Sequence, residues 1–193
     1  SYIAVLRHKK PVGKKVAVIG AGGIGFDVAE YLVHDGHSTT LDLEAWKAEW
    51  GVTDPALAPG GLSTAKPEVT PPARDVVLLQ RKKGKLGAGL GKTTGWIHRS
   101  TLKMKNVEMV GGVNYERIGD EGLLISYGEE RKDPTWIPCD NVILCAGQVP
   151  LRSLADELAA SGRQVHVIGG AFEAGELDAK KAIDQAARLA AML

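Results

Sequence analysis

A short apolar run followed at once by a glycine-rich turn is the feature that most restricts the fold of this 193-residue chain. Residues 16–19 are continuously apolar and mostly β-branched, which is typical of a parallel strand buried on both faces. The next six residues read Gly-Ala-Gly-Gly-Ile-Gly, and apolar residues then recur at helical spacing as far as Val33. The sequence therefore predicts a strand, a glycine turn and a helix, in that order.

The glycine turn has the spacing Gly-x-Gly-x-x-Gly, and the strand before it and the helix after it are the context that gives this motif meaning. Gly20 makes the tight turn, Gly22 lets a pyrophosphate approach the backbone, and Gly25 lets the helix pack closely on the strand. The helix N-terminus presents unpaired N–H groups and a partial positive charge to the pyrophosphate. We predict a dinucleotide-binding turn made of Gly20, Ala21, Gly22, Gly23, Ile24 and Gly25.

The end of the second predicted strand, residues 76–80, indicates which dinucleotide binds. NAD sites place an acidic residue at this tip, where it accepts hydrogen bonds from the ribose 2′-OH. Here the tip is Gln80, and Arg81 and Lys82 begin the densest basic run of the chain. A guanidinium binds a 2′-phosphate with paired hydrogen bonds, whereas a carboxylate repels it. We therefore predict NADPH, with Arg81 and Lys82 as the partners of its 2′-phosphate and Gln80 as a cofactor-binding residue at the strand tip. The alternative is that the basic run is only a solvated edge.

The region 35–74 is predicted to be an extended insertion, because five of the nine prolines lie between Pro55 and Pro72. Within it, residues 43–50 predict a short helix that stops at Gly51, with Trp46 and Trp50 docking the insertion on the body of the protein. The glycine-rich stretch 87–93 lacks the spacing of a nucleotide triphosphate loop, since Leu86 stands where the first glycine would be needed. We expect a flexible loop beside the cofactor there.

The remaining pattern predicts an α/β fold, a Rossmann-like three-layer dinucleotide-binding domain with a small antiparallel β meander. Helices are expected over 93–105, capped by Thr93 or Thr94, near 153–160, and over 179–193 with Asp178 as its N-cap. Strands are expected over 107–110, 141–145 and 164–168, and the meander over 112–138 with turns at 119–122 and 129–134. The last helix is expected to bury five apolar residues: Ala182, Ile183, Ala186, Ala187 and Ala190.

The composition excludes several classes of protein. The chain is 44% hydrophobic and 24% charged, as in ordinary globular proteins. Its 24 basic and 23 acidic side chains leave a net charge of +1, so the overall charge does not attract the chain to nucleic acid or to an anionic membrane. No apolar run approaches the ~20 residues of a membrane span, and we expect a cytoplasmic location. Two cysteines cannot supply the usual four ligands of an iron–sulfur cluster, and the five histidines are scattered, so we predict no metal site and no catalytic side chain.

Four stretches together resemble the C-terminal part of bacterial NADPH-dependent 2,4-dienoyl-CoA reductase. These are residues 20–27, residues 90–99 with the sequence Leu-Gly-Lys-Thr-Thr-Gly-Trp-Ile-His-Arg, residues 145–148, and residues 168–170 with 176–179. Proteins of that family join a flavin-bearing barrel, an FAD domain, and an NADPH domain inserted within the FAD domain. The resemblance implies that electrons pass from NADPH to FAD, through a 4Fe–4S cluster to FMN, and then to a conjugated fatty acyl-CoA of β-oxidation.

The resemblance also implies that this chain is a fragment. Residues 1–12 would be a lead from the FAD domain, residues 13–147 the NADPH-binding domain, and residues 148–193 a return segment that adds a C-terminal βα piece of the FAD-binding domain. FMN, the 4Fe–4S cluster and the barrel would belong to a missing N-terminal part, which would be the partner of this chain. Alternatives are a related NAD(P)H:flavin oxidoreductase acting on another enone or amine, and a stand-alone nucleotide-binding module.

Further cofactor residues follow from the resemblance. It implies cofactor contacts for Ala146 and Gly147 after the strand 141–145, and FAD contacts for Gly169 and Gly170. The family has an aspartate where this chain has Gly170, which removes an expected side-chain contact to the FAD ribityl chain. The start of the last helix, at Asp178 and Ala179, would direct N–H groups and the helix dipole at the flavin.

Overall fold

The structure is a computed structural model that describes residues 1–34, 36, 38–175 and 179–193. It divides into two compact units, Ser1–Ala146 and Gly147–Leu193, which are described separately. This division falls beside the predicted boundary after residue 147. The assignment of the second unit to an FAD-binding domain stays a prediction.

The first unit is built on a parallel sheet of four strands in the order β3-β2-β1-β7. The strands are β1 (Lys15–Ile19), β2 (Asp75–Gln80), β3 (Glu108–Gly111) and β7 (Asn141–Leu144). Val18 of β1 pairs with Leu78 on one side and Ile143 on the other, and it is 0% exposed. The prediction of a central parallel strand buried on both faces is therefore confirmed.

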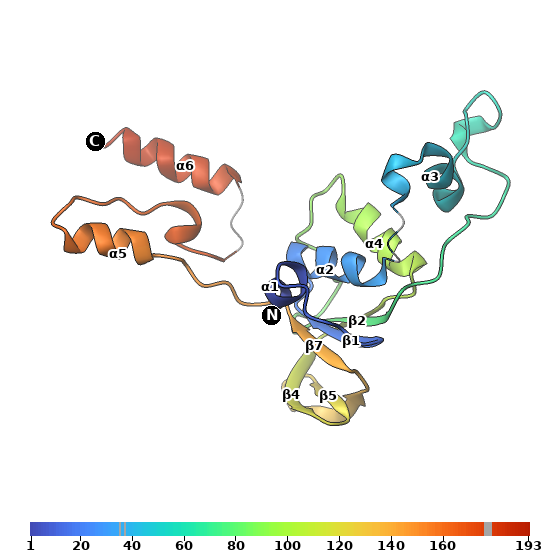
Figure 1. Cartoon of the computed structure of the whole chain (residues 1–193), viewed down its shortest axis with the longest axis horizontal. Helices are drawn as coiled ribbons and strands as arrows, with labels where there is room; N and C mark the ends of the chain where they lie inside the picture. The colour runs from blue at the N-terminus through green and yellow to red at the C-terminus, as the bar shows by residue number, and fades with distance from the viewer. Residues whose placement is uncertain (35, 37, 176–178) are drawn as a thin grey trace. The chain divides into compact units, whose positions relative to one another are not determined.

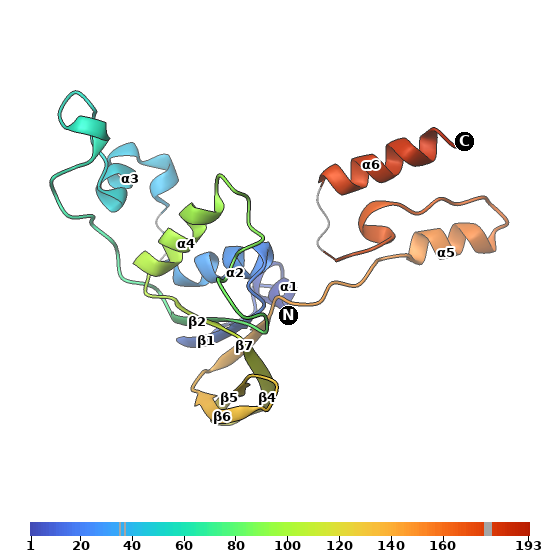
Figure 2. The same ribbon diagram turned by 180° about the vertical axis from the view of Figure 1, so that it is seen from behind.

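Two helices cover one face of this sheet, α2 (Gly23–Val33) and α4 (Gly95–Met104), as both ribbon views show (Figures 1 and 2). Phe26 and Leu32 of α2 pack with Leu78 in one hydrophobic core. A short helix, α1 (Tyr2–Leu6), lies in the predicted lead and adds Val5 to the same core. Thr94 is the N-cap of α4, but its side chain makes no capping hydrogen bond.

The other face of the sheet carries the meander (Figures 1 and 2). Its antiparallel strands are β4 (Val113–Gly119), β5 (Gly122–Tyr127) and β6 (Lys132–Ile137). Val113, Leu123 and Ile125 form a second core with the residues of β1 and β2 that point away from the helices. Helices, sheet and meander make three layers, as predicted, although β6 begins inside the stretch expected to be a turn.

The insertion contains α3 (Leu43–Trp50) between two short 3-10 helices, η1 (Thr39–Leu41) and η2 (Pro59–Gly61). The bounds of α3 match the prediction for a local reason at each end. The Asp42 carboxylate accepts a hydrogen bond from the Ala45 N–H at 3.0 Å, and Gly51 ends the helix in the left-handed conformation with φ 62°. The rings of Trp46 and Trp50 share a face, with centroids 6.5 Å apart.

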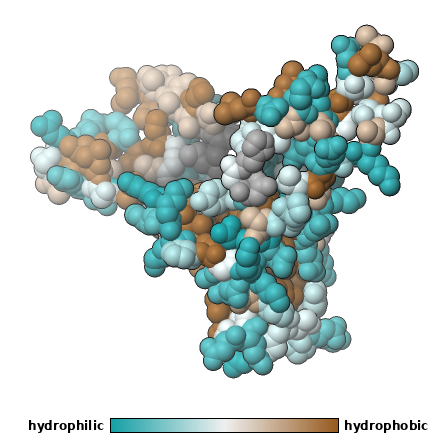
Figure 3. All heavy atoms as spheres, turned by 45° about the vertical axis from the view of Figure 1, so that its right-hand side comes forward, coloured by the Kyte–Doolittle hydropathy of each residue, from teal (hydrophilic) through white to brown (hydrophobic). Residues whose placement is uncertain are grey.

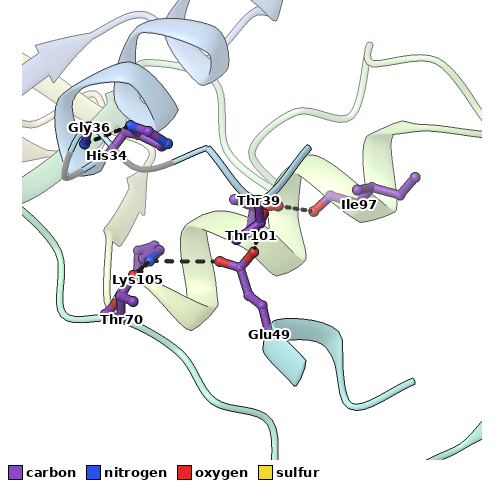
Figure 4. Close-up of polar contacts among 8 residues, drawn as sticks. All are labelled: His34, Gly36, Thr39, Glu49, Thr70, Ile97, Thr101 and Lys105. Carbon is purple, nitrogen blue, oxygen red and sulfur yellow. Dashed lines mark hydrogen bonds and ion pairs between the residues drawn. The ribbon is translucent and has the colours of Figure 1, made fainter. Parts of the chain in front are cut away.

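A buried lysine anchors the insertion on α4 (Figure 4). Lys105, 8% exposed, donates to the Thr70 carbonyl at 2.9 Å, and its Nζ lies 3.8 Å from the Glu49 carboxylate. Glu49 in turn accepts a hydrogen bond from the Thr39 hydroxyl at 2.8 Å. The two tryptophans line a cavity of about 310 Å³ together with residues of α4. The insertion is docked as expected, but the anchoring lysine has no local signal in the sequence, because its partners Thr70 and Glu49 are far from it in the chain.

The second unit contains α5 (Ser153–Ala160), η3 (Gly169–Ala171) and α6 (Ala179–Ala190). The predicted strand over 164–168 is wrong: these residues are not in a strand, and within the described part of this unit no other strand offers them a partner. The predicted burial on α6 is also wrong, since none of its residues is buried and Ile183 is 67% exposed. Hydrophobic side chains stand at the surface of this unit (Figure 3). Asp178 lies outside the described residues.

Within the described residues, no helix combines the length and apolar character that spanning a membrane requires.

Candidate dinucleotide-binding site

The glycine turn joins β1 to α2, and two of its glycines are fixed by close backbone contacts. Gly20 has φ 109°, its N–H donates to the Leu79 carbonyl at 2.8 Å, and a Cβ on it would lie 2.9 Å from the Ala146 nitrogen. A Cβ on Gly25 would lie 1.7 Å from the Gly20 carbonyl oxygen. No other residue type fits either position without moving the backbone.

The other two glycines face open space. A Cβ on Gly22 or Gly23 would meet no atom within 4 Å apart from the adjoining residues and the backbone of α2 itself. Gly22 is the N-cap of α2 and supplies no side-chain cap, so the first N–H groups of the helix are left for another acceptor. The side chains of Ala21 and Ile24 pack on the first core. An open cradle of N–H groups at a helix N-terminus fits a pyrophosphate.

Gln80, at the tip of β2, closes the loop that follows it. Its amide nitrogen donates to the Lys82 carbonyl at 3.0 Å and to the Gly84 carbonyl at 3.3 Å. The Lys82 carbonyl also accepts from the Gly112 N–H at 3.0 Å, at the start of the meander. The Gln80 side chain is therefore used to hold the conformation of the basic loop, and its contact with the cofactor stays a prediction.

The basic run after β2 spreads over more than one face. Arg81 lies within electrostatic reach of Tyr115 on β4: burial raises the pKa of that hydroxyl to about 12, and the charge of Arg81 acts in the opposite direction. Tyr115 packs against the second core, on the meander side of the sheet. Both Arg81 and Lys82 are exposed. Arg81 is therefore accessible to an anion while it stands next to the meander.

The loop between the basic run and α4 is anchored, which differs from the expected flexible loop. Leu86 is 7% exposed in the first core, and Leu90 packs against the same core. The Arg99 guanidinium donates to the Gly87 carbonyl at 3.0 Å, and a Cβ on Gly87 would lie 2.7 Å from the Phe26 ring. The physical reason is that this glycine-rich sequence carries two leucines that bury apolar surface.

Parallel strands bring the predicted pyridine-nucleotide residues to one edge. Gly20, Gln80 and Ala146 all lie at the carboxyl ends of strands that pair in register, with Ile19 opposite Leu79 and Leu144. This edge is where doubly wound sheets bind ligands. Gly147, which opens the second unit, stays a sequence-based prediction.

The predicted FAD residues lie in the second unit. Gly169 is buried with φ 61°, and its N–H donates to the side-chain carbonyl of Gln185 on α6 at 2.7 Å. Gly170 continues this turn, and Ala179 opens α6. Gln185 is a positioning residue that the sequence analysis missed, because a polar residue sixteen positions away gives no local signal.

Two further groups near the sheet have shifted pKa values. His98 of α4 lies 2.8 Å from the Glu30 carboxylate of α2, and burial raises the pKa of Glu30 despite this partner. Burial raises the pKa of the Cys145 thiol to about 11. Among the residues that the structure describes, no group of three His, Cys, Asp or Glu side chains is placed to hold a metal ion.

Several solved structures are similar to this chain. A 2-naphthoyl-CoA reductase solved with 2-naphthoyl-CoA is 22% identical, with a TM-score of 0.63 over 95% of this chain and 22% of that chain. A 6-hydroxypseudooxynicotine amine oxidase from Pseudomonas geniculata N1 is 18% identical, with a TM-score of 0.60 over 91% of this chain and 22% of that chain. Histamine dehydrogenase from Rhizobium sp. 4-9 is 14% identical, with a TM-score of 0.58 over 89% of this chain and 22% of that chain.

The likeness to these structures establishes the fold, and the chain spans 22% of the length of each of them. Residues 3–172 match the family described as pyridine nucleotide-disulphide oxidoreductase, whose members are oxidoreductases that bind FAD and NAD(P)H. Because this match covers most of the 193 residues, the chain belongs to the pyridine nucleotide-disulphide oxidoreductase family.

Proposed function

We propose that this chain is the NADPH-binding part of a flavoprotein oxidoreductase that passes hydride from NADPH to FAD. The observation that carries this proposal is the open cradle over Gly22 and Gly23, at the N-terminus of α2 and at the carboxyl edge of the parallel sheet. Gly20 and Gly25 cannot be replaced there without moving the backbone, which accounts for the first and last glycines of the Gly-x-Gly-x-x-Gly motif, while Gly22 leaves the space above the turn open. When bound, NADPH supplies the hydride and FAD accepts it.

In this proposal the protein binds and orients the cofactor. The backbone of Gly20, Ala21, Gly22, Gly23, Ile24 and Gly25 holds the pyrophosphate with N–H groups and the dipole of α2. Arg81 and Lys82 bind the 2′-phosphate, on a loop whose shape Gln80 fixes through two carbonyl groups. Ala146 packs beneath Gly20, and Gly147 follows it at the same end of β7.

We further propose that residues 148–193 belong to the FAD-binding domain, where Gly169, Gly170, Asp178 and Ala179 approach the flavin. The parent enzyme then carries FMN and a 4Fe–4S cluster in an N-terminal barrel, which is the partner of this chain, and reduces 2,4-dienoyl-CoA in fatty acid β-oxidation in the cytoplasm. Support comes from the motif at 90–99 and from a fold shared with a reductase solved with 2-naphthoyl-CoA. The fold shared with amine-oxidising enzymes keeps an amine substrate as the second candidate.

The cradle is tested with two substitutions of nearly equal size. Gly22→Asp and Gly22→Asn both place a good N-cap on α2, and the open space admits either side chain. Only the aspartate adds a negative charge beside the pyrophosphate. We expect titration calorimetry to show NADPH binding lost in Gly22→Asp and weakened less in Gly22→Asn, with both variants folded by circular dichroism. Equal NADPH affinity in the wild-type chain and Gly22→Asp would contradict the proposal.

The preference for NADPH is tested with Arg81→Ala. Removing a charged hydrogen bond costs about 1.5–3 kcal/mol, which corresponds to roughly 10- to 100-fold weaker binding. We expect this loss for NADPH and not for NADH, because NADH lacks the 2′-phosphate. Lys66→Ala removes a charge from an exposed residue of the insertion and serves as the control. An equal loss of affinity for NADPH and NADH would show that Arg81 does not bind the 2′-phosphate.

The substrate requires the parent polypeptide. NADPH consumption with a 2,4-dienoyl-CoA, and none with an amine, is the expected result. Activity with an amine alone would favour the second candidate, and would leave the nucleotide-binding experiments above unaffected.

A further inference from the structure

A hollow of about 620 Å³ lies over β3, the outer strand of the parallel sheet. We call it the edge groove, and its volume is within the usual range for a binding site. Its lining includes Lys85, Trp96, Arg99, Lys103, Met109 and Gly111. None of these residues belongs to the glycine turn or to the cofactor residues assigned above.

One wall of the edge groove is a single face of α4. Trp96, Arg99 and Lys103 follow one another at intervals of three and four residues, which places them on the same side of the helix. The indole of Trp96 is 55% exposed. Arg99 uses one of the five N–H donors of its guanidinium to bind the Gly87 carbonyl at 3.0 Å, which fixes the position of its charge. An aromatic ring and two cations therefore face the groove together.

The opposite wall is the loop after β2, which carries Lys85. This loop lies against the end of β3, since a Cβ on Gly111 would be 3.1 Å from the Gly84 carbonyl oxygen. Cations thus stand on two sides of the groove, and the described residues that line it include no acidic side chain. Trp96 and Met109 supply apolar surface between them. The lining therefore fits a ligand that combines acidic groups with an apolar one.

The floor of the groove is a strand with an open side. β3 pairs in parallel with β2, and among the described strands none pairs with its other side. Such an edge leaves backbone N–H and C=O groups for an extended peptide to bind. Met109 and Gly111 are two residues apart, so they lie on the same face of the sheet. A strand added beside β3 would likewise turn every second side chain toward the groove.

The charge of the groove decides between two kinds of strand partner. Pairing β3 with β3 of a second copy would bring Lys85, Arg99 and Lys103 of one chain near the same cations of the other, and like charges repel. A partner with acidic side chains gains attraction at the same place. Charge complementarity therefore favours an acidic segment of a different protein.

We propose that the edge groove docks an acidic, extended segment of a separate protein, which adds to β3 as a further strand. Its groove-facing side chains alternate acidic and apolar, and they meet Lys85, Lys103 and Trp96. Backbone hydrogen bonds to β3 supply affinity, and the alternate side chains supply specificity. This interaction goes beyond the proposed function, because it uses neither NADPH nor FAD.

The probe is the capped peptide Thr-Glu-Thr-Leu-Thr-Glu-Thr, in which the second, fourth and sixth side chains share one face of a strand. Its binding to the whole 193-residue chain is followed by fluorescence anisotropy of an N-terminal dye. A peptide with glutamine in place of both glutamates and with the same dye is the control, and it should bind about tenfold more weakly. Equal affinity of the two peptides would overturn the proposal.

Strand addition is tested on the backbone of the probe. One peptide is N-methylated at its threonines and another at its glutamates and leucine, so the side chains are unchanged. An added strand bonds to its neighbour through alternate residues, so one of these peptides should lose binding and the other should keep most of it. Equal affinity of the two methylated peptides would overturn the addition of a strand to β3.

The cations are tested with the double variant Lys85→Gln and Lys103→Gln. The matched control is Lys66→Gln with Lys83→Gln, two exposed lysines outside the groove. We expect the groove variant to weaken probe binding about tenfold, and the control to stay within about twofold, with both variants folded by circular dichroism. Probe affinity that is unchanged in the groove variant would overturn the proposal.

Other occupants give different results, each of which would overturn the proposal. Displacement of the probe by saturating NADPH would assign the groove to the nucleotide. Sedimentation of the wild-type chain as a dimer that does not bind the probe would assign β3 to a second copy. A parent polypeptide that fails to bind the probe, although the 193-residue chain binds it, would show that another part of the parent fills the groove. Loss of probe binding alone leaves the proposed function unaffected.

Discussion

Gly25 and Gly20 approach so closely that a Cβ on Gly25 would lie 1.7 Å from the Gly20 carbonyl oxygen. The obstructing atom belongs to the backbone, so no side-chain rotation relieves the clash. This contact holds the start of α2 against the end of β1, and with it the orientation of the helix N-terminus toward the carboxyl edge. The same glycine spacing that serves a pyrophosphate is thus a packing requirement before any ligand binds.

Gly25→Ala should therefore destabilise the fold. Overpacking a tight site typically costs about 1–3 kcal/mol, and a backbone obstruction places this variant at the upper end or beyond. Urea unfolding followed by circular dichroism measures the loss. Gly23→Ala is the control: its Cβ enters open space, and alanine favours a helix over glycine by about 0.5–1 kcal/mol, so stability should not fall. Equal stability of the two variants would contradict the packing account.

Lys105→Met should loosen the insertion from α4. The substitution keeps an apolar stem but leaves the Thr70 carbonyl and the Glu49 carboxylate without the ammonium group, at an expected cost of about 1–3 kcal/mol. Limited proteolysis should also cut the insertion faster. Lys47→Met removes a more exposed ion pair with Glu44 and should cost about 0.5 kcal/mol or less. An unchanged cleavage rate in Lys105→Met would show that the lysine does not anchor the insertion.

Glu30 should make stability depend on pH in an unusual direction. Burial raises its pKa above 4.5, so the folded state holds this proton more tightly than the unfolded chain does. Its contribution to stability is complete below pH 4.5 and is lost as the pH rises through the raised pKa. From pH 4.5 upward, the Glu30→Gln variant should therefore become progressively more stable relative to the wild type, as judged by the free energy of unfolding. A constant difference across urea unfolding at several pH values would contradict this.

Glu116 should show the opposite slope. A hydrogen bond from the Ser126 hydroxyl, and then the charge of Arg131, lower the pKa of this carboxyl below 4.5. Its contribution is complete above pH 4.5 and is lost as the pH falls through the lowered pKa. Glu116→Gln should be less stable than the wild type at neutral pH, and the difference should shrink in acid. A difference that widens in acid would contradict the assignment.

Cys145 should react slowly while the chain is folded. Its pKa of about 11 leaves about one thiolate in a thousand at pH 8, and its side chain is 8% exposed. Timed iodoacetamide treatment and peptide mass spectrometry should find Cys139, which is less buried, modified first. Both cysteines should react at similar rates in urea. Modification of Cys145 as fast in the folded chain as in urea would contradict its burial.

Local rules predicted much of the first unit. The strand before Gly20, the helix after it and the limits of α3 follow from an apolar run, a capping aspartate and a left-handed glycine, all of which act within a few residues. The strand expected over 164–168 failed because strand propensity needs a second strand to receive its hydrogen bonds, and the described part of the second unit offers none.

The sequence by itself thus determined the family of fold and the glycine turn, since the turn depends on residues adjacent in the chain. Only the tertiary structure decided which distant residues meet: Lys105 with Thr70, Arg81 beside Tyr115, and Lys85 opposite the Trp96–Lys103 face of α4. The reason is physical. A parallel sheet brings the ends of strands that are far apart in sequence to one edge. Helices pack on one face of this sheet and the meander on the other, so Lys85 of the basic run lies on the helix side and Arg81 on the meander side.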